Sequence, residues 1–240
     1  MKQIIPISGE SPLDTLKRCD GYYERPTSGP LVGYAGRDEQ GRQYVGMVYA
    51  NFAKGERHGK VLLRVASELV GKYPNISAQG DGFCGAPEGG KALAAVLAAS
   101  LGKGYIFPEK QVTVLKTDSS REKSVLVWGR HEPEPGENWW IVEDVCNNFS
   151  TTAELIKLIE SRGAKVVGII CFLNRSIHVE TDYPVKPGCL VPVNALVRKK
   201  IAEYRQDDPA VAGDIAAKNI VWKPKNEWSR LREAMQQCGS

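Results

Sequence analysis

The stretch from Trp139 to Thr152, WWIVEDVCNNFSTT, is the most informative part of this sequence. It begins as an apolar segment typical of a buried strand, reaches two adjacent carboxylates, Glu143 and Asp144, and passes into a short polar turn that opens a helix. Carboxylates accept hydrogen bonds from sugar hydroxyls, and the N–H groups at the start of a helix bind phosphate. The order of strand, acidic pair, turn and helix therefore suits a sugar phosphate.

Strands alternate with helices on both sides of this stretch. Residues 166–173, VVGIICFL, are apolar at nearly every position, as in a parallel strand covered on both faces. Thr151 and Glu154 fit a capping box at the start of the intervening helix. The pattern predicts an α/β fold with a central parallel sheet flanked by helices. The expected strands are 44–52, 79–84, 105–107, 112–115, 139–145, 166–173 and 188–193, and the other expected helices are 58–73, 92–101 and 195–204.

The 240 residues are enough for a main domain and a smaller attachment. Residues 1–75 form an N-terminal segment with the first helix, residues 76–183 form the core, and residues 184–240 form a C-terminal segment of different character. We expect the two terminal segments to build a second, smaller subdomain.

Composition and charge exclude several classes of function. The 32 Lys and Arg residues against 28 Asp and Glu are dispersed, so no nucleic-acid partner is implied. The six cysteines lie far apart without metal-ligand spacing, which favours reduced and mostly buried thiols. The start, MKQIIPISGE, lacks an apolar signal core, and no stretch is long and apolar enough to span a bilayer. We therefore expect a cytoplasmic protein without a membrane partner.

Three loops carry the candidate chemistry. The glycine-rich loop from Gly85 to Lys91 lets the backbone approach an anion, although an ordinary strand-to-helix turn explains it equally well. The acidic pair at the end of strand 139–145 favours a ligand, because buried charge is costly unless it meets a cation, a hydroxyl or solvent; pairing with Lys or Arg is the alternative. Residues 116–138 read as a long, charged and mobile excursion, or as a solvated surface loop.

The segment IVEDVCNNFSTT resembles the hallmark motif of the type I phosphoribosyltransferases, which is an apolar run, two acids, two apolar residues and a turn rich in Thr and Gly. The resemblance implies that Glu143 and Asp144 contact the ribose hydroxyls of 5-phosphoribosyl-1-diphosphate (PRPP), with Asp144 counted as catalytic. It also implies that the following turn wraps the 5-phosphate, through Asn147, Asn148, Ser150 and Thr151. Phe149 stands where the family usually has Gly. Because Phe does not easily take a positive φ, we expect a turn of different shape or an altered phosphate grip.

Within the family, residues 81–175 resemble the orotate phosphoribosyltransferases. GAPEGGKALAA occupies the place of their diphosphate-binding loop, without the Lys expected inside it, which implies substrate contacts from Gly85, Ala86, Glu88, Gly89, Gly90 and Lys91. Asn174 and Arg175 match an Asp-Arg pair whose Arg recognises the orotate base; a solvated cation at the strand end is the alternative. Residues 116–138 fall where the family has a basic catalytic loop, which makes Lys116, Arg121 and Lys123 the candidate catalytic cations.

The resemblance implies a Mg²⁺-dependent enzyme, a glycosyltransferase of pyrimidine nucleotide biosynthesis that transfers ribose 5-phosphate from PRPP to orotate and releases diphosphate. Mg²⁺ would be held mainly by PRPP. The terminal segments would form a small hood subdomain, and the shared loop implies a homodimer. Two alternatives stay open: transfer to another base, and a non-catalytic regulatory protein that binds PRPP or a nucleotide.

Overall fold

The computed structural model describes residues 3–114, 123–180, 182–186 and 188–237, and divides into two compact units. The first unit joins residues 1–57 to residues 200–240, and the second comprises residues 58–199. Both unit boundaries differ from the predicted limits after residues 75 and 183. The reason is that the helix at Gly59–Lys72 and the strands that follow residue 183, up to Arg198, pack within the second unit.

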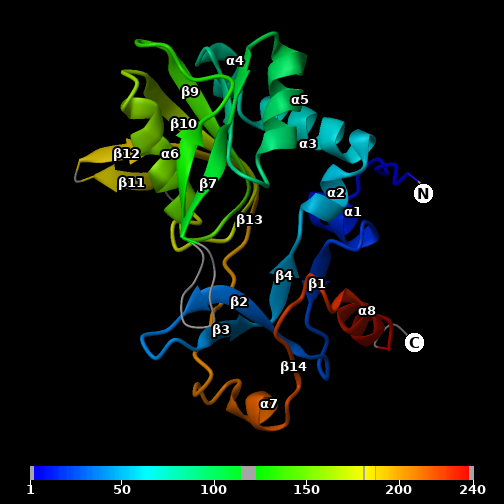
Figure 1. Ribbon diagram of the computed structural model, residues 1–240. Helices are drawn as coiled ribbons and strands as arrows, with labels where there is room; N and C mark the ends of the chain where they lie inside the picture. The colour runs from blue at the N-terminus through cyan, green and yellow to red at the C-terminus, as the bar shows by residue number, and fades with distance from the viewer. Residues whose placement is uncertain (1–2, 115–122, 181, 187, 238–240) are drawn as a thin grey trace. The chain divides into compact units, whose positions relative to one another are not determined.

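The second unit is built on one five-stranded, all-parallel sheet (Figure 1) with the order β13-β10-β9-β5-β6. The predicted α/β fold with a central parallel sheet is therefore confirmed. Helices α3 and α5 contact one another and the sheet, and α6 packs on β9 and β10. The elements of this unit are α3 (Gly59–Lys72), α4 (Asn75–Ala78), β5 (Gly82–Gly85), α5 (Lys91–Leu101), β6 (Gly104–Ile106), β7 (Pro108–Val114), β8 (Lys123–Trp128), β9 (Asn138–Cys146), α6 (Ser150–Glu160), β10 (Lys165–Asn174), β11 (Tyr183–Lys186), β12 (Cys189–Val191) and β13 (Val193–Arg198).

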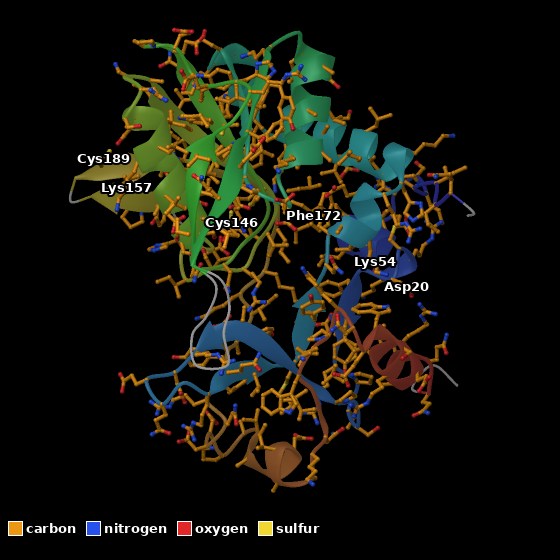
Figure 2. All side chains as sticks on the ribbon, in the orientation of Figure 1. Asp20, Lys54, Cys146, Lys157, Phe172 and Cys189 are labelled. Atoms are coloured by element: carbon orange, nitrogen blue, oxygen red, sulfur yellow. The ribbon has the colours of Figure 1, made fainter. Side chains whose placement is uncertain are left out.

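Hydrophobic burial positions β9 and β10 at the centre of the sheet. Alternate residues of β9 pack on opposite faces, with Trp139 and Ile141 in the core cluster beneath α6 and Trp140 and Val142 buried on the other face. Cys146, labelled in Figure 2, ends β9 as part of that core cluster and is a free, buried cysteine, as expected for the thiols of this chain. Both acids of the motif therefore sit at the carboxyl end of a fully covered strand.

Two predictions about this unit were wrong. Residues 195–204 were expected to form a basic helix, but β13 runs through this region and pairs in parallel with β10, aligning Val193 with Ile169. Burial of Val193 and Ala195 in the core outweighs the helical pattern of the basic residues that follow. The predicted loop 116–138 is partly a strand, because β8 pairs antiparallel with β7.

The first unit contains a three-stranded sheet, β14-β2-β3, and a separate pair, β1-β4. The predicted strand 44–52 is two strands, because β3 pairs with β2 whereas β4 pairs with β1. No helix within the described residues is long and apolar enough to cross a membrane. The elements of this unit are α1 (Pro12–Arg18), β1 (Tyr22–Glu24), β2 (Leu31–Arg37), β3 (Gln43–Gly46), β4 (Val48–Ala50), α2 (Ala53–Glu56), α7 (Ala212–Ala216), β14 (Ile220–Val221) and α8 (Trp228–Gln237).

Candidate functional site

The glycine-rich loop and the acidic pair meet at the carboxyl ends of β5 and β9, which are neighbours in the sheet. A Cβ on Gly90 would lie 1.8 Å from the carbonyl oxygen of Val142, and a Cβ on Gly89 would lie 2.3 Å from Cγ of Asp144. The amide of Ala86 donates to the same Val142 oxygen at 2.9 Å. The absence of side chains at two glycines thus lets the loop lie directly on β9, with the Asp144 carboxylate against its backbone.

The two carboxylates serve opposite faces of the sheet, because successive side chains of a strand alternate. Asp144 faces the glycine-rich loop, and its Oδ1 also accepts a hydrogen bond of 2.8 Å from the Val145 amide. Glu143 faces α6, where the Thr152 hydroxyl donates to Oε1 at 3.5 Å. Asp144 therefore contacts the glycine-rich loop, whereas Glu143 contacts helix α6. Thr152 is a neighbour of Glu143, which the sequence alone did not indicate.

Glu143 has an unusual proton affinity for a carboxyl group. Burial, and then the negative charge of Asp144, raise the pKa of Glu143 from 4.5 to about 8. The Thr152 hydrogen bond and the positive charge of Lys110 oppose this shift. At neutral pH the Glu143 carboxyl of the free protein is therefore mainly protonated, and a cation or another positive group arriving nearby would drive the proton off.

Lys110 is a candidate site residue that the sequence analysis missed. It lies in β7 opposite Leu126 of β8, and Leu126 packs against the core cluster beneath α6. Opposite residues of an antiparallel pair share one face, so Lys110 belongs to the hairpin face that packs against this core cluster, although its own side chain is exposed. No sequence pattern around Lys110 pointed to Glu143, because the two residues are brought together only when the hairpin packs on the unit.

The turn after the acids takes the left-handed conformation at Phe149, with φ 56° and ψ 17°. Phe149 thus adopts the positive φ that a bulky residue does not easily take, and its side chain is buried and stacks on Tyr183, which compensates the backbone cost. Whether the phosphate grip is altered stays a prediction. Helix α6 begins at Ser150, with Phe149 at its N-cap. The predicted capping box is therefore wrong, because Thr151 lies inside the helix and not at its N-cap. Instead, Asn148 Oδ1 accepts hydrogen bonds from the amide and the hydroxyl of Ser150, at 3.2 and 3.0 Å.

The glycine-rich loop connects β5 to α5 and is fixed by its own hydrogen bonds. The Gly90 amide donates to the Ala86 carbonyl at 2.9 Å. Lys91 forms an ion pair of 3.2 Å with Glu88 and lies 4.9 Å from the centre of the Phe107 ring. Because the Ala86 and Gly90 amides already donate to protein carbonyls and Pro87 has no N–H group, the predicted anion contacts of this loop rest on the amides of Glu88 and Gly89 and on the Lys91 ammonium.

Arg175 follows β10 and is buried, so the alternative of a solvated cation at the strand end is wrong. Its amide donates to the carbonyl of Cys146 at 2.9 Å, which places it beside the end of β9. Asn174, also buried, accepts hydrogen bonds from the amide and hydroxyl of Ser176 and donates to the carbonyl of His178. Asn174 therefore shapes the loop that carries Arg175.

Of the three cations predicted in the basic loop, the structure describes only the position of Lys123 in the chain fold. Lys116 and Arg121 lie outside the described residues, and Lys123 is the first residue of β8. Their assignment as catalytic cations stays a prediction.

A magnesium ion fits the donors of this site by chemistry. Among the residues that the structure describes, no group of three His, Cys, Asp or Glu side chains is arranged to hold a metal. Two adjacent carboxylates at the open end of the sheet nevertheless supply the oxygen ligands that Mg²⁺ prefers. This arrangement agrees with an ion held mainly by a ligand's own oxygens.

The sheet is an open parallel sheet of an α/β fold, with an acidic pair and a glycine-rich loop at the carboxyl ends of adjacent strands, the edge where such sheets bind ligands. That fold is the type I phosphoribosyltransferase fold. The structure of orotate phosphoribosyltransferase from Aeropyrum pernix aligns with a TM-score of 0.52 and 20% identity, over 76% of this chain and 91% of that one.

Sequence comparison agrees with the structural match. The chain is similar to orotate phosphoribosyltransferase of a Nitratiruptor species, with 29% identity over 132 residues, which are 54% of this chain and 60% of the relative. The same enzyme of Desulforamulus reducens is 28% identical over 128 residues, 53% of this chain and 61% of the relative. The chain thus spans about three fifths of the length of these relatives, and no protein-family model matches it. The predicted resemblance is confirmed.

Proposed function

We propose that this protein is a phosphoribosyltransferase that transfers ribose 5-phosphate from PRPP to orotate and releases diphosphate. One observation carries the proposal: the Asp144 carboxylate lies directly against Gly89 of the glycine-rich loop. Groups suited to ribose hydroxyls and groups suited to a diphosphate thereby occupy one edge of the sheet. The similarity to proteins named orotate phosphoribosyltransferase supports the choice of reaction.

We assign the proposed roles according to the loops at the carboxyl edge of the sheet. Asp144 and Glu143 accept hydrogen bonds from the ribose hydroxyls, and the turn with Asn147, Asn148, Ser150 and Thr151 binds the 5-phosphate at the start of α6. Residues 85–91 hold the diphosphate, and Arg175 recognises the base. Lys116, Arg121 and Lys123 stabilise the negative charge of the leaving diphosphate.

Bound Mg²⁺ would neutralise diphosphate oxygens and so make diphosphate a better leaving group. In the free protein the Glu143 proton partly offsets the repulsion between the two adjacent carboxyl groups. Loss of that proton would supply a second carboxylate for the sugar hydroxyls.

Purified protein with Mg²⁺, PRPP and orotate should form orotidine monophosphate and diphosphate, detected by chromatography and by a diphosphate assay. A panel of other bases in the same assay tests the alternative acceptor. No product from any base would refute the proposal, and calorimetric binding of PRPP without turnover would instead support a regulatory protein.

The proposal includes a homodimer and a cytoplasmic location, both expected from the resemblance. Light scattering at working protein concentration tests the first, and a monomer there would contradict it. Fractionation of cells that express the tagged chain tests the second.

A further inference from the structure

Three aromatic side chains form a cluster beside the turn that follows the acidic pair. The Phe149 ring stacks on Tyr183 of β11, with centroids 4.3 Å apart and planes 21° apart. His178 meets the edge of Tyr183 at 5.8 Å and lies 6.2 Å from Phe149. We call Phe149, His178 and Tyr183 the aromatic cluster; it joins segments that are far apart in the sequence.

Phe149 is an unfavourable residue for the conformation it adopts. A left-handed φ of 56° is natural for Gly and strained for a bulky residue. Phe149 is 4% exposed and shares the core cluster with residues of β9 and α6. The energy that holds this φ therefore comes from burial and stacking, so the shape of the turn depends on Tyr183.

The aromatic cluster also reaches the loop that carries Arg175. His178 is fixed in that loop because its amide donates to the Ser176 hydroxyl at 3.0 Å and its carbonyl accepts from Asn174 at 3.1 Å. The Arg175 amide is bonded to the end of β9. One aromatic contact thus ties the turn at residues 147–150 to the loop at residues 174–178.

We propose that Phe149 and Tyr183 are positioning residues whose stack sets the turn at residues 147–150 for the 5-phosphate of PRPP. The inference rests on the proposed function and extends it. In this chain the conformation that a glycine would adopt freely is imposed by an aromatic contact from β11. The phosphate grip is consequently controlled by the hairpin of β11 and β12, which supplies no predicted phosphate contact of its own.

The central test compares Tyr183→Ala with Tyr183→Phe. The alanine variant removes the stack without changing any residue of the turn, whereas phenylalanine keeps the ring. We expect Tyr183→Ala to raise KM for PRPP by about tenfold while kcat changes by less than about threefold, because a ground-state phosphate contact is misplaced. Tyr183→Phe should restore KM to within about twofold of the wild-type value.

Two further variants separate positioning from general packing. Val185→Ala loosens the same strand against the same core cluster but leaves the stack intact, so it should lower the melting temperature without changing KM for PRPP. Phe149→Gly relieves the backbone cost and removes the ring, so adding Tyr183→Ala to it should cause little further change in KM. An equal change of KM in Val185→Ala and Tyr183→Ala, or additive effects of Phe149→Gly and Tyr183→Ala, would overturn the inference.

A readout independent of turnover keeps this inference apart from the proposed function. The Ala153 amide donates to the Phe149 carbonyl at 2.8 Å, so its hydrogen exchange reports on the turn. Exchange at Ala153 should accelerate in Tyr183→Ala and not in Tyr183→Phe or Val185→Ala. If the wild-type protein transfers no phosphoribosyl group, the proposed function fails, and this exchange pattern still decides whether Tyr183 sets the turn.

Discussion

The carboxylate of Asp144 lies so close to the α-carbon of Gly89 that a Cβ there would stand 2.3 Å from Asp144 Cγ. The neighbouring Gly90 faces backbone instead, because a Cβ on Gly90 would stand 1.8 Å from the Val142 oxygen. A methyl group at residue 89 therefore displaces a short side chain, whereas one at residue 90 displaces a strand. Substitution of Gly89 should therefore affect mainly activity, whereas substitution of Gly90 should affect mainly stability.

We expect Gly89→Ala to lower kcat/KM by about 10- to 100-fold with a small change of melting temperature, because the displaced group is a substrate-binding carboxylate. Gly90→Ala should instead destabilise the fold by about 1–3 kcal/mol or more, as overpacking does. Gly71→Ala is the control, since nothing lies within 4 Å of its Cβ position. Thermal melts and steady-state kinetics on the three variants check the pattern, which fails if Gly89→Ala is as active as Gly71→Ala.

Asp144→Asn keeps the shape of the side chain and removes its charge. We expect kcat/KM for PRPP to fall by about 100-fold, since a neutral amide binds ribose hydroxyls and a cation less well. Glu160→Gln, at the exposed end of α6, removes one negative charge away from the site and should leave kcat/KM unchanged. Equal activity of the two variants would remove Asp144 from the catalytic residues.

The raised pKa of Glu143 predicts a specific pH dependence of stability. Between the unfolded pKa near 4.5 and the folded pKa of about 8, the folded protein holds one proton more than the unfolded chain. The free energy of unfolding should therefore fall as pH rises through this window, by the amount that this group contributes. Glu143→Gln should flatten that part of the curve in urea titrations at pH 5, 6, 7 and 8. Identical curves for the variant and the wild type would contradict the shift.

The positive charge of Lys110 lowers the pKa of Glu143, so removal of this charge should raise that pKa further. In Lys110→Gln the Glu143 pKa should lie higher than in the wild-type protein, and the limb of the pH–rate profile that reports Glu143 should move to more alkaline pH. Lys157→Gln, on the exposed surface of α6 (Figure 2), is a matched removal of one positive charge. The same movement in both variants would show a general charge effect instead of a specific interaction with Glu143.

Arg175 offers a test of base recognition. Arg175→Lys keeps the charge and loses the planar fork of donors, so KM for orotate should rise by about tenfold with KM for PRPP nearly constant. Arg162→Lys is the control, because Arg162 is an exposed arginine just after α6 and the same substitution there should leave both KM values unchanged. A rise in KM for PRPP alone would place Arg175 at the sugar phosphate and not at the base.

Strands β9 and β10 of the central sheet were predictable because they carry long apolar runs that a covered parallel strand buries. The 195–204 region was misread because the burial of Val193 and Ala195 depends on β10, which lies more than 20 residues earlier in the chain. Strand β8 was missed for a similar reason, since its partner β7 and the core beneath α6 decide its conformation. Local propensity is a weak signal wherever packing supplies most of the stabilisation.

Residue order within short segments was enough to predict the α/β class, the position of Glu143 and Asp144 at a strand end, and the resemblance to phosphoribosyltransferases. Three interactions could be found only in the folded chain: Asp144 lies on Gly89, Lys110 acts on Glu143, and Phe149 keeps a left-handed turn by stacking on Tyr183. Each of these contacts joins residues that are distant in sequence, and the distances and burial that set their energies exist only after the sheet, its helices and its hairpins have packed.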